Sequence, residues 1–341
     1  MKTRAIILAV TLTALFFIPM TAIPTESFQN KAENNFLSQN EQIGEESAAQ
    51  SGLEPEKANS FTEESFRIYD LTSKEIYEIG AADYVRGAIA AEMGADFEFE
   101  ALVAQGRAAF SCALYQKSAH TDADYDFTAD PQNRFMFVTE EQVREIYGEA
   151  FGEKWNKICL AAEEALSAVV TFDGAPAMTV YHAISAGKTQ SAADIWGGTV
   201  PYLTEVESAW DENCEGFITK SVRSKEEVLE SLNAYGAKLS GAMPEQWFQG
   251  GEYTSGGYLK RIQIGFATFS GSKLRTLFGL RSSAFTAEYS DGEFVFTVRG
   301  YGHGVGMSQV GANEMAKNGA LAEEILEYYY PGTKLLPASN Y

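Results

Sequence analysis

The sequence is short of cysteine and of positive charge, and each shortage argues against a class of protein. Its three cysteines, Cys112, Cys159 and Cys214, cannot all pair and show no close metal-ligand spacing, so we infer neither a disulfide framework nor a zinc ribbon. Lysine and arginine number 26 against 47 acidic residues, which gives a net charge of −21. A phosphate backbone would repel such a chain. The charge therefore argues against a nucleic-acid partner, but not against a neutral polymer such as a sugar chain.

Histidine is also scarce. The chain has three, His120, His182 and His303, and they are widely separated, with no short ligand pair and no helical H-x-x-x-H motif. We therefore expect no metal site. His182 and His303 both fall in expected loops, and we interpret them as neutral hydrogen-bonding residues in a cleft.

The longest apolar run lies at the N-terminus. Lys2 and Arg4 precede nineteen largely apolar residues, 5–23. At about 1.5 Å per residue such a run just spans a bilayer core, so it fits either a membrane anchor or a signal peptide. The positive charges ahead of it place the N-terminus in the cytoplasm and the rest of the chain outside. No small-x-small cleavage site is evident, which favours an uncleaved anchor.

The rest of the chain divides into a spacer and a globular part. Residues 25–65 are polar and acidic with almost no apolar periodicity, as is typical of a disordered linker. The whole chain of 341 residues is 45% hydrophobic, which is a globular composition. We expect an anchor at 1–24, a linker at 25–65 and one globular domain at 66–341.

Hydrophobic periodicity within that domain predicts an α+β fold, with helices and β-hairpins joined by long loops around a cleft. Helices are expected at 139–147, 153–167 and 224–235, in addition to a helix pair described next. Hairpins are expected at 66–71 with 76–79, at 169–172 with 178–181, and at 285–289 with 294–298, with a further strand at 259–264. Polar loops are expected at 118–133 and 182–203.

A carboxylate lies where the two helices of the expected pair meet. Asp83 can cap a helix that runs to Met93 and breaks at Gly94, and a second helix begins after Asp96. Glu92 falls at the end of the first helix, flanked by alanines and a methionine. Poor solvation would raise its pKa and let it act as a general acid. The alternative is an ordinary solvated glutamate near a helix end.

Glycine alternates with other residues around His303. The glycines at 300, 302, 304 and 306 allow backbone angles closed to other residues and let a bulky ligand approach the main chain. The stretch lacks the lysine of a phosphate-binding loop and the spacing of a dinucleotide fingerprint. Ser308 and Gln309 begin a helix whose free amide donors can hold a sugar substituent. The alternative is a tight structural turn.

Three segments carry unusual motifs in a fixed order. They are YVRGAIAAEM followed by EALVAQGRAAFS, then YHAISAGKTQSAADIWGGTVPYL, then RGYGHGVGMSQVGANEMAKNGALAEEILEYYYPGTKL. Together they resemble the stage II sporulation protein D family (SpoIID/LytB), which are peptidoglycan lytic transglycosylases. Weaker similarity, KLRTLFGLRSSAF included, extends the resemblance over residues 66–336.

The resemblance implies an acid and a reaction. The family's catalytic acid is the Glu of its E-M-P segment, which falls on Glu92. The implied reaction cleaves the β-1,4 bond between N-acetylmuramic acid and N-acetylglucosamine and gives a 1,6-anhydro product. One carboxyl group suffices, first as acid for the leaving oxygen and then as base for the muramic acid 6-hydroxyl. A hydrolase that uses a second carboxylate, Asp194, is an alternative.

The resemblance also implies substrate contacts at matching positions. Trp196 and Tyr202 are expected to offer apolar faces to sugar rings. The family has a proline at Gly94 and an arginine at Phe110, and we expect Arg107, one helical turn earlier, to replace that arginine. The expected substrate-binding residues are Gln105, Arg107, His182, Ser185, Thr189, Asp194, Trp196, Tyr202, His303, Ser308 and Gln309.

Partners and location follow from the same resemblance. The implied substrate is stem-peptide-denuded glycan strands, and the implied partners are a peptidoglycan amidase and membrane proteins of the engulfment machinery. The catalytic domain would act outside the cell membrane, between mother cell and forespore during sporulation. No cofactor is expected, and no structural zinc, because the loop from His120 through Phe137 lacks cysteine. The alternative is a catalytically impaired glycan-binding or scaffold member of the family.

Overall fold

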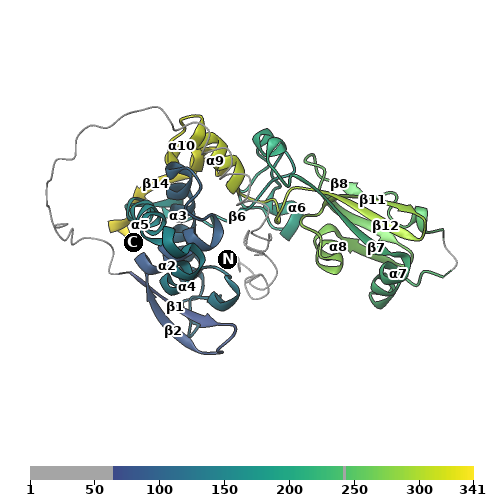
Figure 1. Ribbon diagram of the computed structural model, residues 1–341, viewed down its shortest axis with the longest axis horizontal. Coiled ribbons are helices and arrows are strands. Elements are labelled where there is room, and N and C mark those ends of the chain that lie inside the picture. Colours follow the sequence, from purple (N-terminus) through teal and green to yellow (C-terminus); the bar gives the residue numbers. More distant parts are fainter. Residues whose placement is uncertain (1–63, 241–242) are drawn as a thin grey trace, which may run out of the picture.

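The computed structural model describes residues 64–240 and 243–341, which form two lobes (Figure 1). Both ends of the described chain build the first lobe, whose hydrophobic core is drawn from 66–203 and 305–338. The stretch between them builds the second lobe around a core drawn from 228–298. Helices and small sheets make up the two lobes, so the α+β prediction is confirmed. The expected single domain thus holds two large hydrophobic cores.

The predicted helix pair is present as α2 (Ala81–Glu92) and α3 (Phe99–Ala119). Gly80 is the N-cap of α2 and Asp83 lies in its first turn, so the prediction that Asp83 caps this helix was wrong. An acidic residue is favourable in either place, because the positive end of the helix dipole extends over the first turn. Gly94, with φ +77°, ends the helix just after Glu92.

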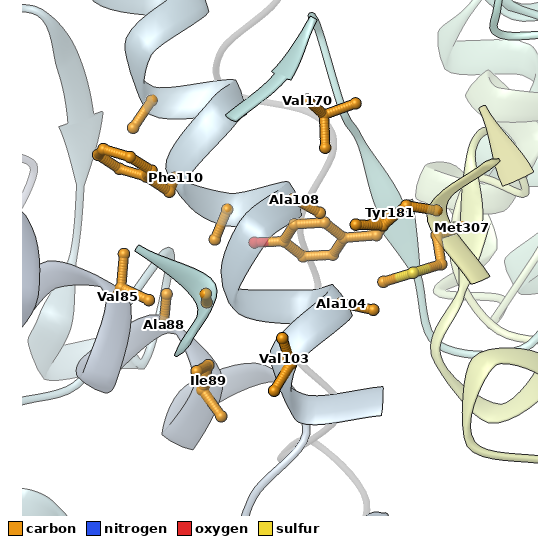
Figure 2. Close-up of a cluster of buried hydrophobic side chains, with 14 of the residues drawn as sticks. Val85, Ala88, Ile89, Val103, Ala104, Ala108, Phe110, Val170, Tyr181 and Met307 are labelled. Atoms are coloured by element: carbon orange, nitrogen blue, oxygen red, sulfur yellow. The ribbon is translucent and has the colours of Figure 1, made fainter. Parts of the chain in front are cut away.

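Helix α3 is the central element of the first lobe (Figure 2). All its residues from Ala101 to Leu114 are buried. A Cβ atom at Gly106 would lie 2.7 Å from Cβ of Ala165, at the end of α5 (Phe151–Ala165), and 2.9 Å from Cδ1 of Ile89 on α2. The glycine therefore lets three helices pack closely, and α2 is held firmly at the end that carries the acid.

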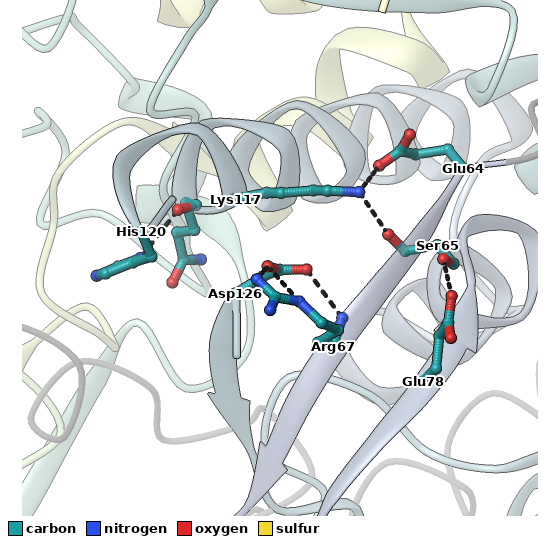
Figure 3. A network of polar contacts seen from close by, with 8 residues as sticks. Glu64, Ser65, Arg67, Glu78, Lys117, His120 and Asp126 are labelled. Atoms are coloured by element: carbon teal, nitrogen blue, oxygen red, sulfur yellow. Dashed lines mark hydrogen bonds and ion pairs between the residues drawn. The ribbon is translucent and has the colours of Figure 1, made fainter. Parts of the chain in front are cut away.

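The predicted first hairpin is confirmed as β1 (Ser65–Asp70) paired antiparallel with β2 (Ile76–Gly80). A third strand, β3 (Phe127–Ala129), joins β1 in parallel within a stretch that was expected to be loop. Figure 3 shows how this edge is fastened: the backbone nitrogen and Nη2 of Arg67 both donate to the buried carboxylate of Asp126, at 2.9 and 2.7 Å. Three residues are too few to show an alternating pattern in the sequence.

Helix α4 (Glu140–Tyr147) begins where its capping motif predicts. The hydroxyl of Thr139 accepts from the Gln142 backbone nitrogen, and the Gln142 side chain accepts from the Thr139 nitrogen. The next helix, α5, starts two residues before the predicted 153–167 and ends two residues earlier.

The hairpin predicted from 169–172 and 178–181 is wrong in its second strand. Strand β4 (Ala168–Phe172) pairs with the two-residue β5 (Ala175–Pro176) and, on its other side, with β14 (Lys334–Pro337). The following residues instead form β6 (Tyr181–His182), which pairs in parallel with β13 (Met307–Ser308). His182 thus lies on a short strand and not on a free loop. This pairing joins the second and third sequence motifs.

The second lobe consists mainly of two antiparallel three-stranded sheets with one helix beside each. The predicted helix at 224–235 and the strands at 259–264, 285–289 and 294–298 are confirmed, within one residue at each end. Strands β7, β8 and β10 and helix α8 were not predicted. The elements are β7 (Ile218–Ser224), α7 (Lys225–Ala234), β8 (Glu252–Tyr253), β9 (Leu259–Ile264), β10 (Ala267–Ser270), α8 (Gly271–Phe278), β11 (Ala284–Ser290) and β12 (Glu293–Arg299).

Three further helices complete the first lobe and its junction with the second. Helix α6 (Ala192–Trp196) interrupts the expected loop, whereas α9 (Gln309–Lys317) and α10 (Ala322–Tyr329) pack on α3. Apart from Glu64 and Ser65, the expected anchor and linker lie outside the described residues. Within the part of the chain that the structure describes, no helix combines the length and the apolarity needed to cross a membrane.

Candidate active site

Glu92 is the last residue of α2 and is only 4% exposed. Burial raises the pKa of its carboxyl group to about 7, against a hydrogen bond from Gln309 that acts in the opposite direction. The group is therefore substantially protonated at neutral pH. A protonated carboxylic acid in a dry environment is a proton donor for a leaving group.

Two side-chain amides surround the acid. Gln309, at the first turn of α9, donates from Nε2 to Glu92 Oε2 at 3.4 Å and to Gln105 Oε1 at 3.3 Å. Both distances are at the long end for hydrogen bonds. Among the residues that the structure describes, the buried atoms Glu92 Oε1 and Gln105 Nε2 have no hydrogen-bond partner. Buried polar atoms are normally satisfied, so this carboxyl oxygen and this amide donor are available to a ligand.

His182 and His303 lie beside each other, with ring centroids 5.8 Å apart. The Val305 carbonyl lies 3.1 Å from Nδ1 of His182, and because a carbonyl only accepts, Nδ1 carries the proton. Nδ1 of His303 accepts from the Val305 backbone nitrogen at 3.0 Å, so its proton is on Nε2. Burial lowers the pKa of His182 to about 4 and that of His303 well below its usual range. The neutral pair thus has an acceptor at His182 Nε2 and a donor at His303 Nε2.

The alternating glycines allow the loop that carries His303 to pack closely against neighbouring segments. A Cβ atom at position 302, where φ is +115°, would lie 2.7 Å from Cβ of His182. A Cβ atom at position 304 would lie 2.7 Å from the ring of Tyr258, and one at 306 would lie 2.0 Å from the Val180 carbonyl oxygen. These glycines therefore accommodate the protein's own backbone and side chains. The expectation that they open space for a ligand is corrected at these three positions.

The two aromatic residues expected to face sugar rings have different surroundings. Trp196, at the end of α6, is partly buried with its ring centroid 6.1 Å from that of His303. Tyr202 is buried in the first core, where its hydroxyl accepts from the Met178 nitrogen at 2.7 Å and its ring packs on Phe172. Trp196 remains a candidate for stacking on a sugar ring. Tyr202 is a core residue, which corrects that prediction.

A buried carboxylate that sequence reasoning missed joins the loop after β6 to α9. Asp211 is fully buried and accepts from the Ser185 nitrogen and the Ser308 hydroxyl, both at 2.9 Å. Burial raises its pKa to about 6, against these hydrogen bonds. Ser308 also accepts from the Gly311 nitrogen as N-cap of α9. Asp211 and Ser308 thus hold the end of the helix from which Gln309 reaches Glu92, whereas Ser185 and Ser308 were expected at the substrate.

Two other residues expected to bind substrate, Thr189 and Asp194, interact instead with groups of the protein itself. Thr189 is fully buried, and its hydroxyl accepts from the Val206 nitrogen at 2.8 Å. Asp194 forms an ion pair with Lys260 at 2.6 Å. Burial raises the pKa of Asp194, but hydrogen bonds from Lys260 and Ser191 outweigh it and the net shift is downward. Asp194 is therefore ionised and neutralised by a lysine of the second lobe.

Comparison with known proteins places these residues in a family. The family model described as stage II sporulation protein, SpoIID, matches residues 69–172. Stage II sporulation protein D of Bacillus subtilis strain 168 is 30% identical over 346 residues, covering 100% of this chain and 98% of that protein. The chain belongs to the stage II sporulation protein D family. The same-named protein of Bacillus amyloliquefaciens is 28% identical over 81% of this chain and 80% of its own length. The amidase enhancer of Bacillus subtilis is 26% identical over 74% of this chain and 40% of its own length.

The arginine position of the SpoIID pattern is occupied by an apolar residue in this chain. Phe110 is 1% exposed and packs edge-on against Phe66 at 6.3 Å in the first core. Arg107 does not replace the missing charge beside Glu92. Its guanidinium pairs with Glu323 on α10 at 2.9 Å and approaches Glu164 on α5 to 3.9 Å. The prediction that Arg107 binds substrate is therefore corrected: this arginine links three helices.

His120, which begins the loop expected to hold no zinc, lies near the edge shown in Figure 3. There the His120 ring contacts the Gln116 carbonyl through Nδ1 at 2.9 Å. Across residues 64–240 and 243–341, no group of three histidine, cysteine or acidic residues is arranged to hold a metal. That this chain takes no structural zinc stays a prediction.

Proposed function

We propose that this member of the SpoIID family is a lytic transglycosylase, which cleaves the bond between N-acetylmuramic acid and N-acetylglucosamine in peptidoglycan and releases 1,6-anhydro ends. One observation carries the proposal: a buried glutamic acid with a pKa of about 7 has one oxygen without a partner among the described residues. An acid in this state matches the requirement for protonating a glycosidic oxygen at neutral pH.

In the proposed mechanism Glu92 acts twice. It first gives its proton to the leaving N-acetylglucosamine oxygen while positive charge develops at the muramic acid ring. Its carboxylate then takes the proton of the muramic acid 6-hydroxyl as that oxygen attacks the anomeric carbon. Both proton transfers use one carboxyl group. Gln309 supports the second step, because its hydrogen bond stabilises the carboxylate.

The surrounding groups fit the recognition of a neutral sugar. The Nε2 atoms of Gln105 and His182, which have no hydrogen-bond partner among the residues that the structure describes, offer one donor and one acceptor. Trp196, beside His303, offers a partly buried aromatic face. A sugar with hydroxyl and N-acetyl groups requires such a mixture of neutral donors, acceptors and apolar surface.

The cellular setting belongs to the same proposal. The relatives named stage II sporulation protein D support a role in sporulation. Within it, the proposed action is on septal peptidoglycan during engulfment, by a domain anchored outside the cell membrane through residues 1–24. The relative named amidase enhancer supports a functional partnership with a peptidoglycan amidase. The amidase would remove stem peptides, and this chain would cleave the denuded strands together with membrane proteins of the engulfment machinery.

A second candidate is a glycan-binding or scaffold protein with little or no activity. Phe110 in place of the family arginine favours it, because Arg107 is engaged with Glu323 and brings no charge to the acid. A hydrolase that uses Asp194 as second carboxylate is less well supported, since the ion pair with Lys260 neutralises that group.

Analysis of the cleavage products separates these candidates. Amidase-treated sacculi are incubated with the protein and with its Glu92→Gln variant, and soluble fragments are identified by mass spectrometry. The proposal expects anhydro-muramic ends, one water lighter than reducing ends, with the wild type only. Reducing ends would establish a hydrolase, and binding without any fragments would establish the scaffold.

A further inference from the structure

Arg275 is a buried cation of the second lobe. It lies on α8 and is 8% exposed. Its Nε and Nη2 atoms have no hydrogen-bond partner, and its guanidinium forms no ion pair, within the two described ranges. Arginine is almost never fully buried unless it is paired, so this side chain departs from the rule.

The polypeptide around Arg275 is joined to the loop that carries His303. The Leu280 nitrogen donates to the Arg275 carbonyl, which closes α8, and the Gly302 nitrogen donates to the Arg281 carbonyl, both at 2.9 Å. The guanidinium is also close to both histidines of the site. Burial is the largest cause of the lowered pKa values of His182 and His303, and for His303 the neighbouring His182 imidazole comes next. The charge of Arg275 lowers both pKa values further. The end of α8 that carries Arg275 therefore lies against the loop that carries His303.

The groups around this cation do not neutralise it. His182 and His303 are uncharged near neutral pH, and the two tyrosines that sense its charge, Tyr258 and Tyr301, have raised pKa values, chiefly through burial. Glu92 does not serve as its counter-ion either, because a cation close to that carboxyl group would lower its pKa instead of leaving it raised. A buried, unpaired charge is unfavourable for folding, so pairing with an anionic group of a ligand would relieve part of this cost.

We propose that Arg275 binds the lactyl carboxylate of N-acetylmuramic acid and is the residue by which this protein distinguishes denuded strands from peptide-bearing ones. The proposal rests on the function argued above and adds a determinant of specificity to it. The lactyl group is the one acidic group of the glycan itself. It is a free carboxylate after the stem peptide is removed and a neutral amide before. The planar guanidinium group can form two parallel, charge-assisted hydrogen bonds to a carboxylate. Its interaction with a neutral amide is much weaker.

Binding measured without cleavage tests this assignment. In the full chain carrying Glu92→Gln, affinity is compared for denuded glycan strands and for the same strands with their carboxyl groups converted to amides. We expect a preference of about 10- to 100-fold for the acidic strands, the usual value of a hydrogen bond to a charged partner. Adding Arg275→Met should abolish the preference, and Arg275→Lys should retain part of it.

Arg223→Met is the matched control. Arg223 carries the same charge and donates to the Phe278 carbonyl at the end of α8, at 3.1 Å, so its loss tests α8 packing without removing Arg275. This variant should keep the full preference. Arg275→Met should melt no lower than the parent protein, because it replaces an unpaired buried charge by an apolar side chain of similar length.

The assignment is overturned if a folded Arg275→Met variant prefers the acidic strands as strongly as its parent. If the methionine variant does not fold, Arg275→Gln decides in the same way. Failure of the proposed function looks different. A protein that shows the Arg275-dependent preference but releases no anhydro ends has the carboxylate site and lacks the transglycosylase activity.

Discussion

Gln309 donates its side-chain amide to Glu92 across 217 positions of the sequence. The contact joins the end of α2, from the first sequence motif, to the start of α9, from the third. Parallel pairing of β6 with β13 places His182 of the second motif beside the same segment. The three motifs are therefore assembled into one site by contacts between residues far apart in the sequence, and the predictions below test those contacts.

Replacing Glu92 by glutamine is expected to abolish activity and to stabilise the protein. Its burial raises the folded-state pKa from 4.5 to about 7, so the folded state binds more protons than the unfolded state between these values. Stability is consequently lost as the pH rises through this window. Glu92→Gln should be more stable above pH 7 by on the order of 1–3 kcal/mol and should lose at least about 10²-fold in activity. Denaturant titrations of both proteins at pH 5 and pH 8 measure this stability difference. An equal difference at the two pH values would contradict a buried acid.

The pH profile of activity should report the acid directly. If protonated Glu92 is required, kcat/KM falls as the pH rises above about 7. The hydrogen bond from Gln309 lowers the pKa of Glu92, so Gln309→Met should move the falling limb to higher pH. His182 should add no limb near its ordinary pKa of 6.5, since its folded-state value is about 4. A Gln309→Met profile displaced to lower pH would count against the assignment.

The role of Ser308 as a positioning residue can be separated from ordinary helix capping. Ser308 and Thr139 both accept from the backbone nitrogen three residues on, at 3.2 and 3.3 Å, but Thr139 caps α4, which does not carry Gln309. Each alanine substitution should cost about 1 kcal/mol of stability. Only Ser308→Ala should also displace the falling limb of the pH profile, because it loosens the turn that holds Gln309. If the two variants keep the same profile, the Asp211–Ser308 contact is structural alone.

Arg107→Met is expected to affect stability and to leave the chemistry intact. The buried guanidinium pairs with Glu323 and Glu164, whose side chains are about half exposed, so the loss should be about 1 kcal/mol. The activity per folded molecule should change by less than about twofold, which is within RT in barrier height. Glu323→Gln is the companion variant and should behave alike. A tenfold loss of kcat in Arg107→Met, but not in Glu323→Gln, would instead indicate that Arg107 contacts the substrate.

Features with a local signature could be predicted from the sequence. The α2–α3 pair, the α4 capping motif and the α9 start at Ser308 each depend on a few neighbouring residues, and the structure has all three. The sequence prediction placed both Gln105 and Arg107 at the substrate. Positions two apart point to nearly opposite sides of a helix, and in the structure Gln105 lies beside Gln309 whereas Arg107 pairs with Glu323.

Other features depend on partners that are distant in sequence. A two-residue strand such as β6 has no periodicity and exists only because β13 lies beside it. Asp211 lies in a stretch without a motif and Arg275 in one of only weak similarity, and their significance comes from burial and from neighbours brought in by other elements. Tyr202 follows a glycine-rich turn that resembles a binding loop, yet its ring is part of the core.

The origin of the oxygen atoms in the product tests the central claim most directly. Denuded strands are cleaved in water enriched in heavy oxygen, and the new muramic acid ends are examined by mass spectrometry. If Glu92 alone serves as acid and then as base for the sugar's own 6-hydroxyl, the ends carry no solvent oxygen and are 1,6-anhydro. Incorporation of one solvent oxygen in a Glu92-dependent reaction would show that water is the nucleophile and would contradict the proposed mechanism.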